Sequence, residues 1–345
     1  MHSKQYGGKL TKQLIAQYQQ SDNWKDGQFQ NLEETKVDIS LYEIPGIIYK
    51  QLRNRGSRVP AEPLPVMPFQ QADFLAPSQE SKFIWYGHSA VLMRINGQTI
   101  FIDPMLGPNA SPIAPFSTNR FSENTLQLID AFPEIDLMLL THDHYDHLDY
   151  ASIQKLKLKT KRYFVALGVK RHLVSWGIEP DLVTEFDWWN HHVFENIKIT
   201  FTPTRHFSGR GLTDRARSLW GGWVFKTASE NIWFSGDGGY GSHFVEIGNR
   251  LGPFDFAFME CGQYNESWRQ IHLFPDESVQ AAIDAQAKKA MPVHWAGFSL
   301  APHHWTDPVA WFFEESSRKS LPLTVPMLGE QALFSDTRLE KWWMA

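Results

Sequence analysis

Three histidines and an aspartate lie at metal-ligand spacing between positions 142 and 147, as His142, His144, Asp146 and His147. Imidazole nitrogen and carboxylate oxygen are ligands for zinc, manganese and iron. The first two histidines can face one metal, while the aspartate and the third histidine face a second. A purely structural role would leave this many polar groups in need of partners beside a buried strand. The spacing therefore predicts a pair of metal ions.

The preceding run Leu137–Leu140 is apolar and predicts a buried strand that delivers these ligands onto a loop. Four ligands do not complete two catalytic shells, so further ligands are expected downstream. Three candidates stand where predicted strands end: His206, Asp237 within a Gly-Asp-Gly turn, and His294. Each alone is weak evidence, because strand-end histidines and Gly-Asp turns are common. Their order along the chain after the first cluster strengthens the interpretation of all three as ligands.

In that order the chain resembles the metallo-β-lactamase-fold superfamily, in which a His-x-His-x-Asp-His motif precedes a distant His, a bridging Asp and a final His. The resemblance implies one metal held by His142, His144 and His206, a second held by Asp146, His147 and His294, and Asp237 shared between them. It also implies a mixed α and β fold, a four-layer αββα sandwich. Two divalent ions are expected as cofactors, with zinc favoured and manganese or iron left open.

A narrower resemblance runs from about Trp85 to Phe298, to the branch that contains N-acylphosphatidylethanolamine-hydrolysing phospholipase D and its bacterial relatives. The matching segments are Trp85-Tyr86-Gly87-His88-Ser89, Ile102-Asp103-Pro104, Thr141 to Asp149, Pro203-Thr204-Arg205-His206, Leu219-Trp220-Gly221-Gly222-Trp223 and Phe234 to Tyr240. The resemblance implies a functional His272. The chain departs from the mammalian phospholipase at Gly209, where that enzyme has a basic residue near the substrate phosphate. Arg210 is the nearest cation and is expected to contact substrate.

These residues receive expected roles. Asp146, Asp237 and His272 are candidate catalytic residues, and His272 could donate a hydrogen bond to a phosphate oxygen or protonate the leaving group. The alternative for His272 is a surface histidine beside a helix. His88, Asp103 and Asp149 are expected to orient ligands. Most of the 14 tryptophans are expected to pack in the core, but Trp268, Trp295 and Trp305 are candidates for the wall of an apolar substrate groove.

Two adjacent metals can activate water and neutralise charge on substrate oxygens. The leading hypothesis is therefore a phosphodiesterase of phospholipase D type that acts on N-acylphosphatidylethanolamine-like lipids. One alternative is a lactonase or sugar-phosphate lactone hydrolase on the same metal site, with attack at carbon. A second is a non-catalytic metal-binding scaffold.

Length and composition set further limits. The 345 residues carry a formal net charge of −5, which provides no basic footprint for nucleic acid. Neither a signal-length apolar run after Met1 nor a membrane-length run is visible, and the single cysteine, Cys261, permits no internal disulfide. We expect a cytoplasmic protein with a small-molecule or lipid substrate. Peripheral membrane contact and a homo-oligomer are left open.

The chain is expected to form one catalytic domain, residues 80–345, with an N-terminal extension, residues 1–79, packed on it. Apolar patterning predicts strands over Phe83–Tyr86, Val91–Ile95, Thr99–Ile102, Leu137–Leu140, Tyr163–Ala166, Ile197–Thr202, Gly222–Phe225, Ile232–Ser235, Phe254–Met259 and Ala290–Val293. Helices are predicted over Tyr150–Leu156, Val169–Trp176, His243–Leu251, Pro275–Ala287 and Pro308–Ser316.

Overall fold

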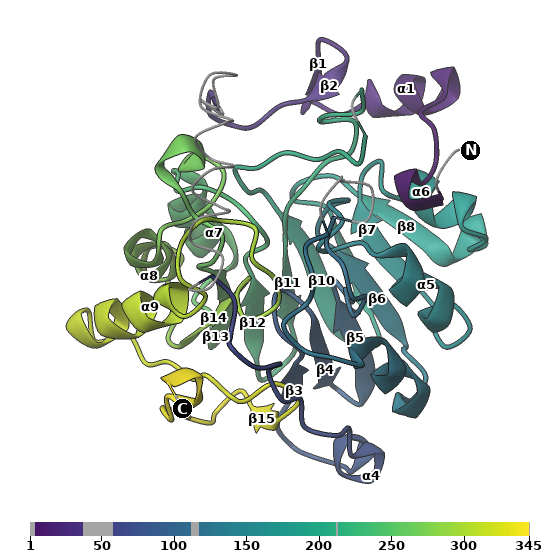
Figure 1. The fold of residues 1–345 in the computed structure, drawn as a ribbon. Helices are drawn as coiled ribbons and strands as arrows, with labels where there is room; N and C mark the ends of the chain where they lie inside the picture. The colour runs from purple at the N-terminus through teal and green to yellow at the C-terminus, as the bar shows by residue number, and fades with distance from the viewer. Residues whose placement is uncertain (1–3, 37–57, 112–116, 212, 345) are drawn as a thin grey trace.

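The computed structural model describes residues 4–36, 58–111, 117–211 and 213–344. Two sheets face each other at its centre (Figure 1). The first has the strand order β15-β3-β4-β5-β6-β7-β8 and the second the order β14-β13-β12-β11-β10-β9. The strands are β3 (Lys82–Trp85), β4 (Val91–Ile95), β5 (Gln98–Ile102), β6 (Leu137–Leu140), β7 (Tyr163–Ala166), β8 (Val183–Phe186), β9 (His191–Phe194), β10 (Ile197–Thr202), β11 (Gly222–Lys226), β12 (Asn231–Phe234), β13 (Phe256–Glu260), β14 (Ala290–Val293) and β15 (Gln331–Leu333).

Helices cover the outer face of each sheet. The first sheet is covered by α5 (Tyr150–Leu156) and α6 (Lys170–Ser175), and the second by α7 (His243–Leu251), α8 (Pro275–Asp284) and α9 (Asp307–Arg318) (Figure 1). Shorter elements are α1 (Lys12–Tyr18), α4 (Gln71–Leu75), the strand pair β1 (Trp24–Lys25) and β2 (Gln28–Phe29), and the 3-10 turns Lys4–Tyr6, Thr125–Ala131, Pro180–Leu182, Glu266–Trp268 and Trp342–Met344. The predicted αββα sandwich is confirmed.

The inner strands β6 and β7 are apolar throughout because both of their faces are covered. β6 pairs in parallel with β5 and β7, and all four of its residues are buried. Aromatic rings join the two sheets: Phe83 of β3 contacts Phe258 of β13 edge to face, with ring centroids 5.2 Å apart. This shared core fixes the two sheets relative to each other.

The ten predicted strands and five predicted helices all occur, with ends shifted by a few residues at some of them. Helix α8 ends at Asp284, earlier than the predicted Ala287. The short pair β1 and β2 was not predicted from the sequence. In the two large sheets the unpredicted strands are β8, β9 and β15, and all three lie at a sheet edge. An edge strand has one hydrogen-bonded neighbour and less burial, so its apolar pattern is weaker. β9, with three of its four residues exposed, is the clearest case.

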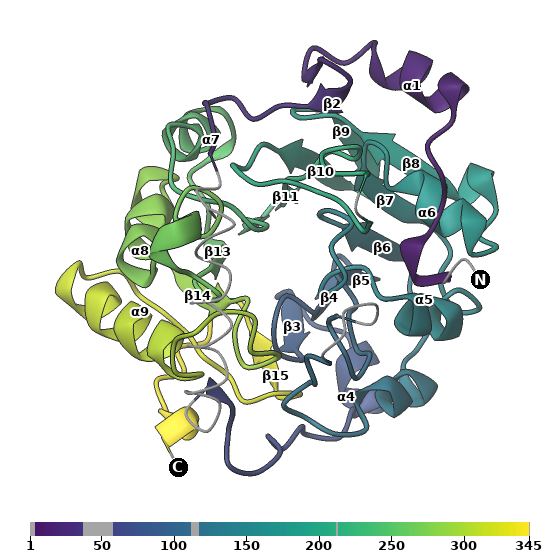
Figure 2. The same cartoon turned by 45° about the horizontal axis from the view of Figure 1, so that its top comes forward.

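The N-terminal arm, defined here as residues 4–36, runs over the rim of the sandwich from α6 towards α7 (Figure 2). Its side chains Tyr18, Trp24 and Phe29 are buried in the same hydrophobic cluster as the sheet residues. The predicted boundary near residue 79 stays a prediction. Within the described ranges, no helix has both the length and the apolar character that crossing a bilayer requires.

Candidate metal centre

The candidate residues come together because they follow strands that point the same way. His88 follows β3, Asp103 follows β5, the loop 141–149 follows β6, His206 follows β10, Asp237 follows β12, Glu260 ends β13 and His294 follows β14. β5 and β6 are parallel neighbours, as are β12, β13 and β14. The carboxyl ends of parallel strands meet at one edge of a sheet, where α/β proteins commonly bind ligands.

Three imidazoles form a first ligand group, His142, His144 and His206. His142 Nε2 lies 2.9 Å from His144 Nδ1, and His206 Nε2 lies 3.2 Å from the same atom. Nitrogen ligands at about 2.0–2.1 Å from a tetrahedral zinc are separated from one another by about 3.3 Å. The observed separations therefore fit three nitrogens that share one cation.

Hydrogen bonds indicate which nitrogen of each imidazole carries the proton. His206 Nδ1 donates to the carbonyl oxygen of Ile271 at 2.9 Å, which leaves the lone pair on Nε2. The Thr141 hydroxyl donates to Asp103 at 2.6 Å, so its oxygen can accept from His142 Nδ1 at 2.9 Å. Both histidines then direct an unprotonated Nε2 into the first group, which is the form that binds a metal.

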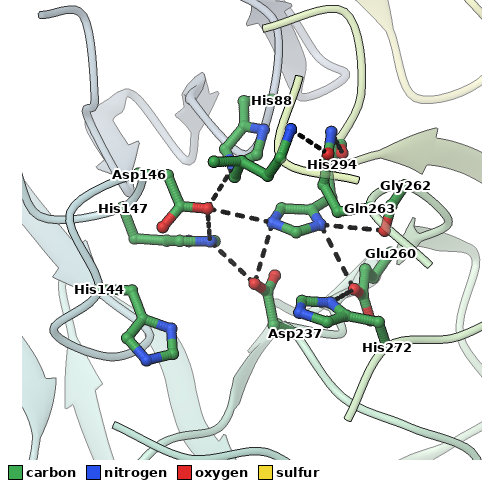
Figure 3. Close-up of polar contacts among 12 residues, drawn as sticks. His88, His144, Asp146, His147, Asp237, Glu260, Gly262, Gln263, His272 and His294 are labelled. Atoms are coloured by element: carbon green, nitrogen blue, oxygen red, sulfur yellow. Dashed lines mark hydrogen bonds and ion pairs between the residues drawn. The ribbon is translucent and has the colours of Figure 1, made fainter. Parts of the chain in front are cut away.

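A second ligand group contains Asp146, His147 and His294 (Figure 3). Asp146 Oδ2 lies 3.7 Å from His147 Nε2 and 3.5 Å from His294 Nε2. The two Nε2 atoms are buried, yet neither has a partner with hydrogen-bond geometry. A buried polar atom without a partner is costly unless an ion or water satisfies it. The second group thus also fits a bound cation.

Asp237 lies between the two groups. Its Oδ2 is 2.9 Å from His147 Nε2, 3.0 Å from His294 Nε2 and 3.9 Å from His142 Nε2. The turn that presents Asp237 requires the preceding glycine: Gly236 has φ +69°, and an added Cβ would lie 2.3 Å from a backbone oxygen of Gly221. The carboxylate is placed to contact a cation in each group.

The first group is electrically neutral. Burial lowers the pKa of His144 to about 4. Burial also holds the pKa values of His142 and His206 well below their ordinary value, and the neighbouring histidines add to that effect. Neutral imidazoles are the form in which histidine binds metals.

In the second group, by contrast, the pKa values of the histidines are raised, because carboxylates lie beside them. Burial alone would lower the pKa of His147, but Asp237, Asp146 and Asp103 outweigh it and raise the pKa to about 10. Burial also opposes the charge on His294, and Asp237 and Asp146 again prevail, so its pKa rises well above the ordinary value. Burial would raise the pKa of Asp237, yet the two histidines hold it well below its usual range. Protons here stand in for the positive charge that a metal would supply.

Strained backbone places several of these side chains. His88, Asp103 and His294 have φ angles of 54°, 41° and 67°, a left-handed region that residues with a Cβ rarely adopt. Such strain tends to concentrate at functional sites. His88 Nε2 lies 2.9 Å from Asp146 Oδ2, and its ring centroid is 4.1 Å from that of His294. His88 thus contacts two members of the second group, and the orienting roles of His88 and Asp103 stay predictions.

Glu260 is a buried member of the centre that the sequence analysis missed. Its Oε1 is hydrogen-bonded to His272 Nδ1 and lies 3.3 Å from His294 Nδ1, while its Oε2 accepts the Gly238 N–H at 2.9 Å (Figure 3). His272 is half-buried, and its ring stacks on His294 with centroids 5.3 Å apart. A charged residue directly after the apolar run Phe256–Met259 was the available signal.

Asp143, also missed, is buried between the ligands His142 and His144. It accepts hydrogen bonds from Ser218 Oγ at 2.6 Å and from the Gly209 N–H at 2.7 Å. These bonds tie the ligand loop to residues 208–218. Its position within the ligand motif was the available signal.

Two expected roles are corrected. Arg210 is 2% exposed, and its Nη1 donates to the carbonyl oxygens of Asp143 and Leu148 at 2.6 and 2.7 Å. Its guanidinium supports the ligand loop from beneath and is not placed to meet a substrate. Asp149 contacts no ligand histidine through any described hydrogen bond. It caps helix α5 instead, accepting from the backbone and hydroxyl of Ser152 at 2.8 and 2.7 Å.

The three candidate tryptophans lie in different surroundings. Trp295 is 1% exposed and stacks with Trp305 and Trp342, so the expectation that it lines an open groove is also corrected. Trp268 and Trp305 are half-buried. The indole N–H of Trp268 donates to the carbonyl oxygen of Gln263 at 2.7 Å. Both remain candidates for substrate contacts.

Only some of the proposed ligands in the two groups are reached by solvent. Among the proposed ligands, His144 and Asp146 are partly exposed, whereas His142, His147, His206, Asp237 and His294 are buried. His272 is partly exposed as well. A substrate that approaches the centre would therefore meet His144, Asp146 and His272 first.

The chain is similar to known proteins in both sequence and fold. Residues 98–295 match the family described as the Beta-lactamase superfamily domain. An uncharacterised protein of Mycobacterium tuberculosis is 33% identical over 336 residues, which cover 96% of this chain and 89% of that protein. N-acyl-phosphatidylethanolamine-hydrolyzing phospholipase D 1 of Caenorhabditis elegans is 32% identical over 228 residues, 63% of this chain and 64% of that enzyme. The solved structure of Igni18, a metallo hydrolase from Ignicoccus hospitalis, superposes with a TM-score of 0.58 at 20% identity, covering 75% of this chain and all of that one.

Proposed function

Because the chain belongs to the metallo-β-lactamase superfamily of metal-dependent hydrolases, we propose that it is a binuclear phosphodiesterase of phospholipase D type that cleaves N-acylphosphatidylethanolamine-like lipids. The observation that carries the binuclear proposal is the position of Asp237, whose Oδ2 lies within 3.9 Å of nitrogens from both ligand groups. The preference for a phosphodiester is supported by the identity shared with the Caenorhabditis elegans phospholipase.

His142, His144 and His206 would hold one metal, and Asp146, His147 and His294 the other, with Asp237 between them. When bound, two adjacent divalent ions supply an activated water and neutralise charge on the substrate oxygens. Zinc is proposed because imidazole and carboxylate suit it, and manganese or iron would be distinguished by elemental analysis.

His272 is proposed to act on the substrate directly. Glu260 holds His272 Nδ1, so proton transfer to a phosphate oxygen or leaving group would use Nε2. The hydrogen bond from the Gly238 backbone fixes the Glu260 carboxylate in turn. Glu260 is thus proposed as the residue that positions His272. A cytoplasmic location is part of the proposal, supported by the single cysteine, Cys261, which is buried and unpaired.

A substrate panel tests the reaction. Protein loaded with zinc, manganese or iron is assayed with N-acylphosphatidylethanolamine, bis-p-nitrophenyl phosphate, a homoserine lactone and a β-lactam, and Asp237→Asn serves as the inactive control. The proposal expects turnover of both phosphodiesters, with the lipid preferred. Turnover of the lactone alone would assign a lactonase instead. Full metal loading with no turnover of any substrate would favour a binding scaffold.

A further inference from the structure

One side chain of the N-terminal arm holds the backbone of a proposed metal ligand. Asn31 Nδ2 donates to the carbonyl oxygen of His206 at 2.8 Å, and Asn31 Oδ1 accepts the His206 N–H at 3.0 Å. β10 ends at Thr202, so His206 stands beyond the strand that leads to it. Both backbone polar groups of His206 are therefore paired with the same amide, 175 residues away in the chain.

The Asn31 amide is itself fixed in place. Its Oδ1 also accepts the Trp220 indole N–H at 3.0 Å, and that N–H lies 3.1 Å from the carbonyl oxygen of Thr204. Two accepted bonds use both lone pairs of the amide oxygen, while the amide nitrogen supplies the donor. Alanine at position 31 would remove the three bonds that the Asn31 amide makes and leave the backbone groups of His206 without their partner.

Through His172, the arm is also connected to the loop that carries the other two ligands of the first group. The Gly8 N–H donates to His172 Nδ1 at 3.1 Å, so His172 can donate through Nε2 to Asp143 Oδ2 at 3.1 Å. The packing there is close, since a Cβ on Gly8 would lie 2.1 Å from the carbonyl oxygen of Arg171. The arm thus contacts the His206 segment directly and the loop of His142 and His144 through His172.

We propose that Asn31 is a positioning residue for the first ligand group, and that the arm is a structural part of that metal site. This inference rests on the proposed assignment of His206 as a ligand. A metal that binds only when the arm is docked stabilises the docked arm. By the same coupling, a docked arm raises the affinity for the metal. Docking of the arm therefore strengthens metal binding at the first group, and the metal stabilises the docked arm.

Metal titration of the full chain tests the first half. Asn31→Ala should lower the affinity for one of the two metals by about ten- to a hundredfold, the usual effect of losing a residue that orients a ligand. The second metal should bind as in the wild type. Asn23→Ala is the matched control, because Asn23 also anchors the arm, through Asp187 Oδ1 at 2.7 Å, but contacts no proposed ligand. Equal losses in the two variants would overturn the inference.

His206→Ala separates this inference from the proposed function. If His206→Ala loses one metal while Asn31→Ala binds both normally, the role of Asn31 is wrong and the metal centre stands. If His206→Ala keeps both metals at wild-type affinity, the assignment of His206 fails, and the inference fails with it.

Hydrogen exchange of the unmodified chain tests the second half and does not depend on how a variant folds. Removing the metals with a chelator should speed amide exchange in residues 28–36 and at His206, with little change in helix α9. His294→Ala, which leaves the first group intact, should keep residues 28–36 protected when metal is present. Unchanged exchange in residues 28–36 after complete metal removal would overturn the inference.

Discussion

Asp103 Oδ2 lies 2.8 Å from His147 Nδ1, and both side chains are fully buried. The two residues follow the neighbouring parallel strands β5 and β6. By accepting the Nδ1 proton, the carboxylate makes Nε2 the nitrogen of His147 that faces Asp237 and the second ligand group, where a metal would replace its proton. Through Thr141 the same carboxylate also orients His142. One buried aspartate therefore orients a histidine in each ligand group.

Asp103→Asn should consequently weaken binding of both metals, by about ten- to a hundredfold. The Asp103 carboxylate accepts from the Thr141 N–H on Oδ1 and from the Thr141 hydroxyl and His147 Nδ1 on Oδ2. An amide has only one accepting oxygen, so the variant would lose the bonds on one of these two sides. Chelator competition measures the affinities. Asp149→Asn is the matched control: it replaces one good helix cap with another and should leave both affinities unchanged. Equal effects in the two variants would contradict the orienting role of Asp103.

Asp237→Asn should lower the affinity for both metals together, because this carboxylate lies between the two groups. His206→Ala should mainly disturb the first group and His294→Ala the second. Elemental analysis of protein purified without chelator should approach two transition-metal equivalents in the wild type. A saturated wild-type protein that holds a single metal would refute the binuclear centre.

The sequence could place the candidate ligands near one another because each follows a strand that the sequence marks clearly, while their binding of metal stays a prediction. The inner strand β6 and the edge strand β14 are both buried along their whole length, so they appear as apolar runs, and His142 and His294 stand just beyond them. Strand β9 has three exposed residues out of four and shows no such run, which is why it was missed. A polar residue directly after an apolar run also marks a candidate ligand in the sequence, because a buried polar group needs a partner.

The surrounding residues could not be predicted with the same success, because contact across the fold leaves no local pattern. Asn31 is one polar residue in a polar arm, and its partner His206 lies 175 positions away. For Arg210, closeness in the sequence was misleading. Arg210 is four positions from His206, but its side chain is buried and donates to carbonyl oxygens of the loop 141–149.

His272→Ala should reduce kcat by about 100- to 10,000-fold while metal content stays unchanged, if this residue transfers a proton to the leaving group. The loss should be larger for the lipid than for bis-p-nitrophenyl phosphate, because p-nitrophenolate leaves without needing a proton. Glu260→Gln should reproduce the direction of this change, since Glu260 holds His272 Nδ1. His304→Ala, at an exposed histidine, is the control.

Several results would contradict that role for His272. Loss of metal in His272→Ala would make the residue part of the metal centre. Unchanged kcat would remove it from the reaction. Equal losses for the two substrates would exclude proton donation to the leaving group and favour a hydrogen bond to the phosphate oxygens.

His172 should make stability depend on pH. Burial, reinforced by the charge of Arg171, lowers the His172 pKa to about 3, whereas an unfolded histidine titrates near about 6.5. Between these values the unfolded chain binds the proton and the folded chain does not, so stability is lost as the pH falls below about 6.5. This residue should account for about 2 kcal/mol of lost unfolding free energy between pH 7 and pH 5.

Denaturant unfolding of metal-free wild type and His172→Gln at both pH values measures this contribution. Metal-free protein is required because acid also releases metals, which would add their own pH dependence. The variant removes the titrating group, so its unfolding free energy should fall less between pH 7 and pH 5. His191→Gln, at an exposed histidine on β9, should behave as the wild type. An identical pH dependence in wild type and His172→Gln would contradict the prediction. It would show that His172 is protonated in the folded protein as readily as in the unfolded chain, so that its contacts with Gly8 and Asp143 tolerate a charged imidazole.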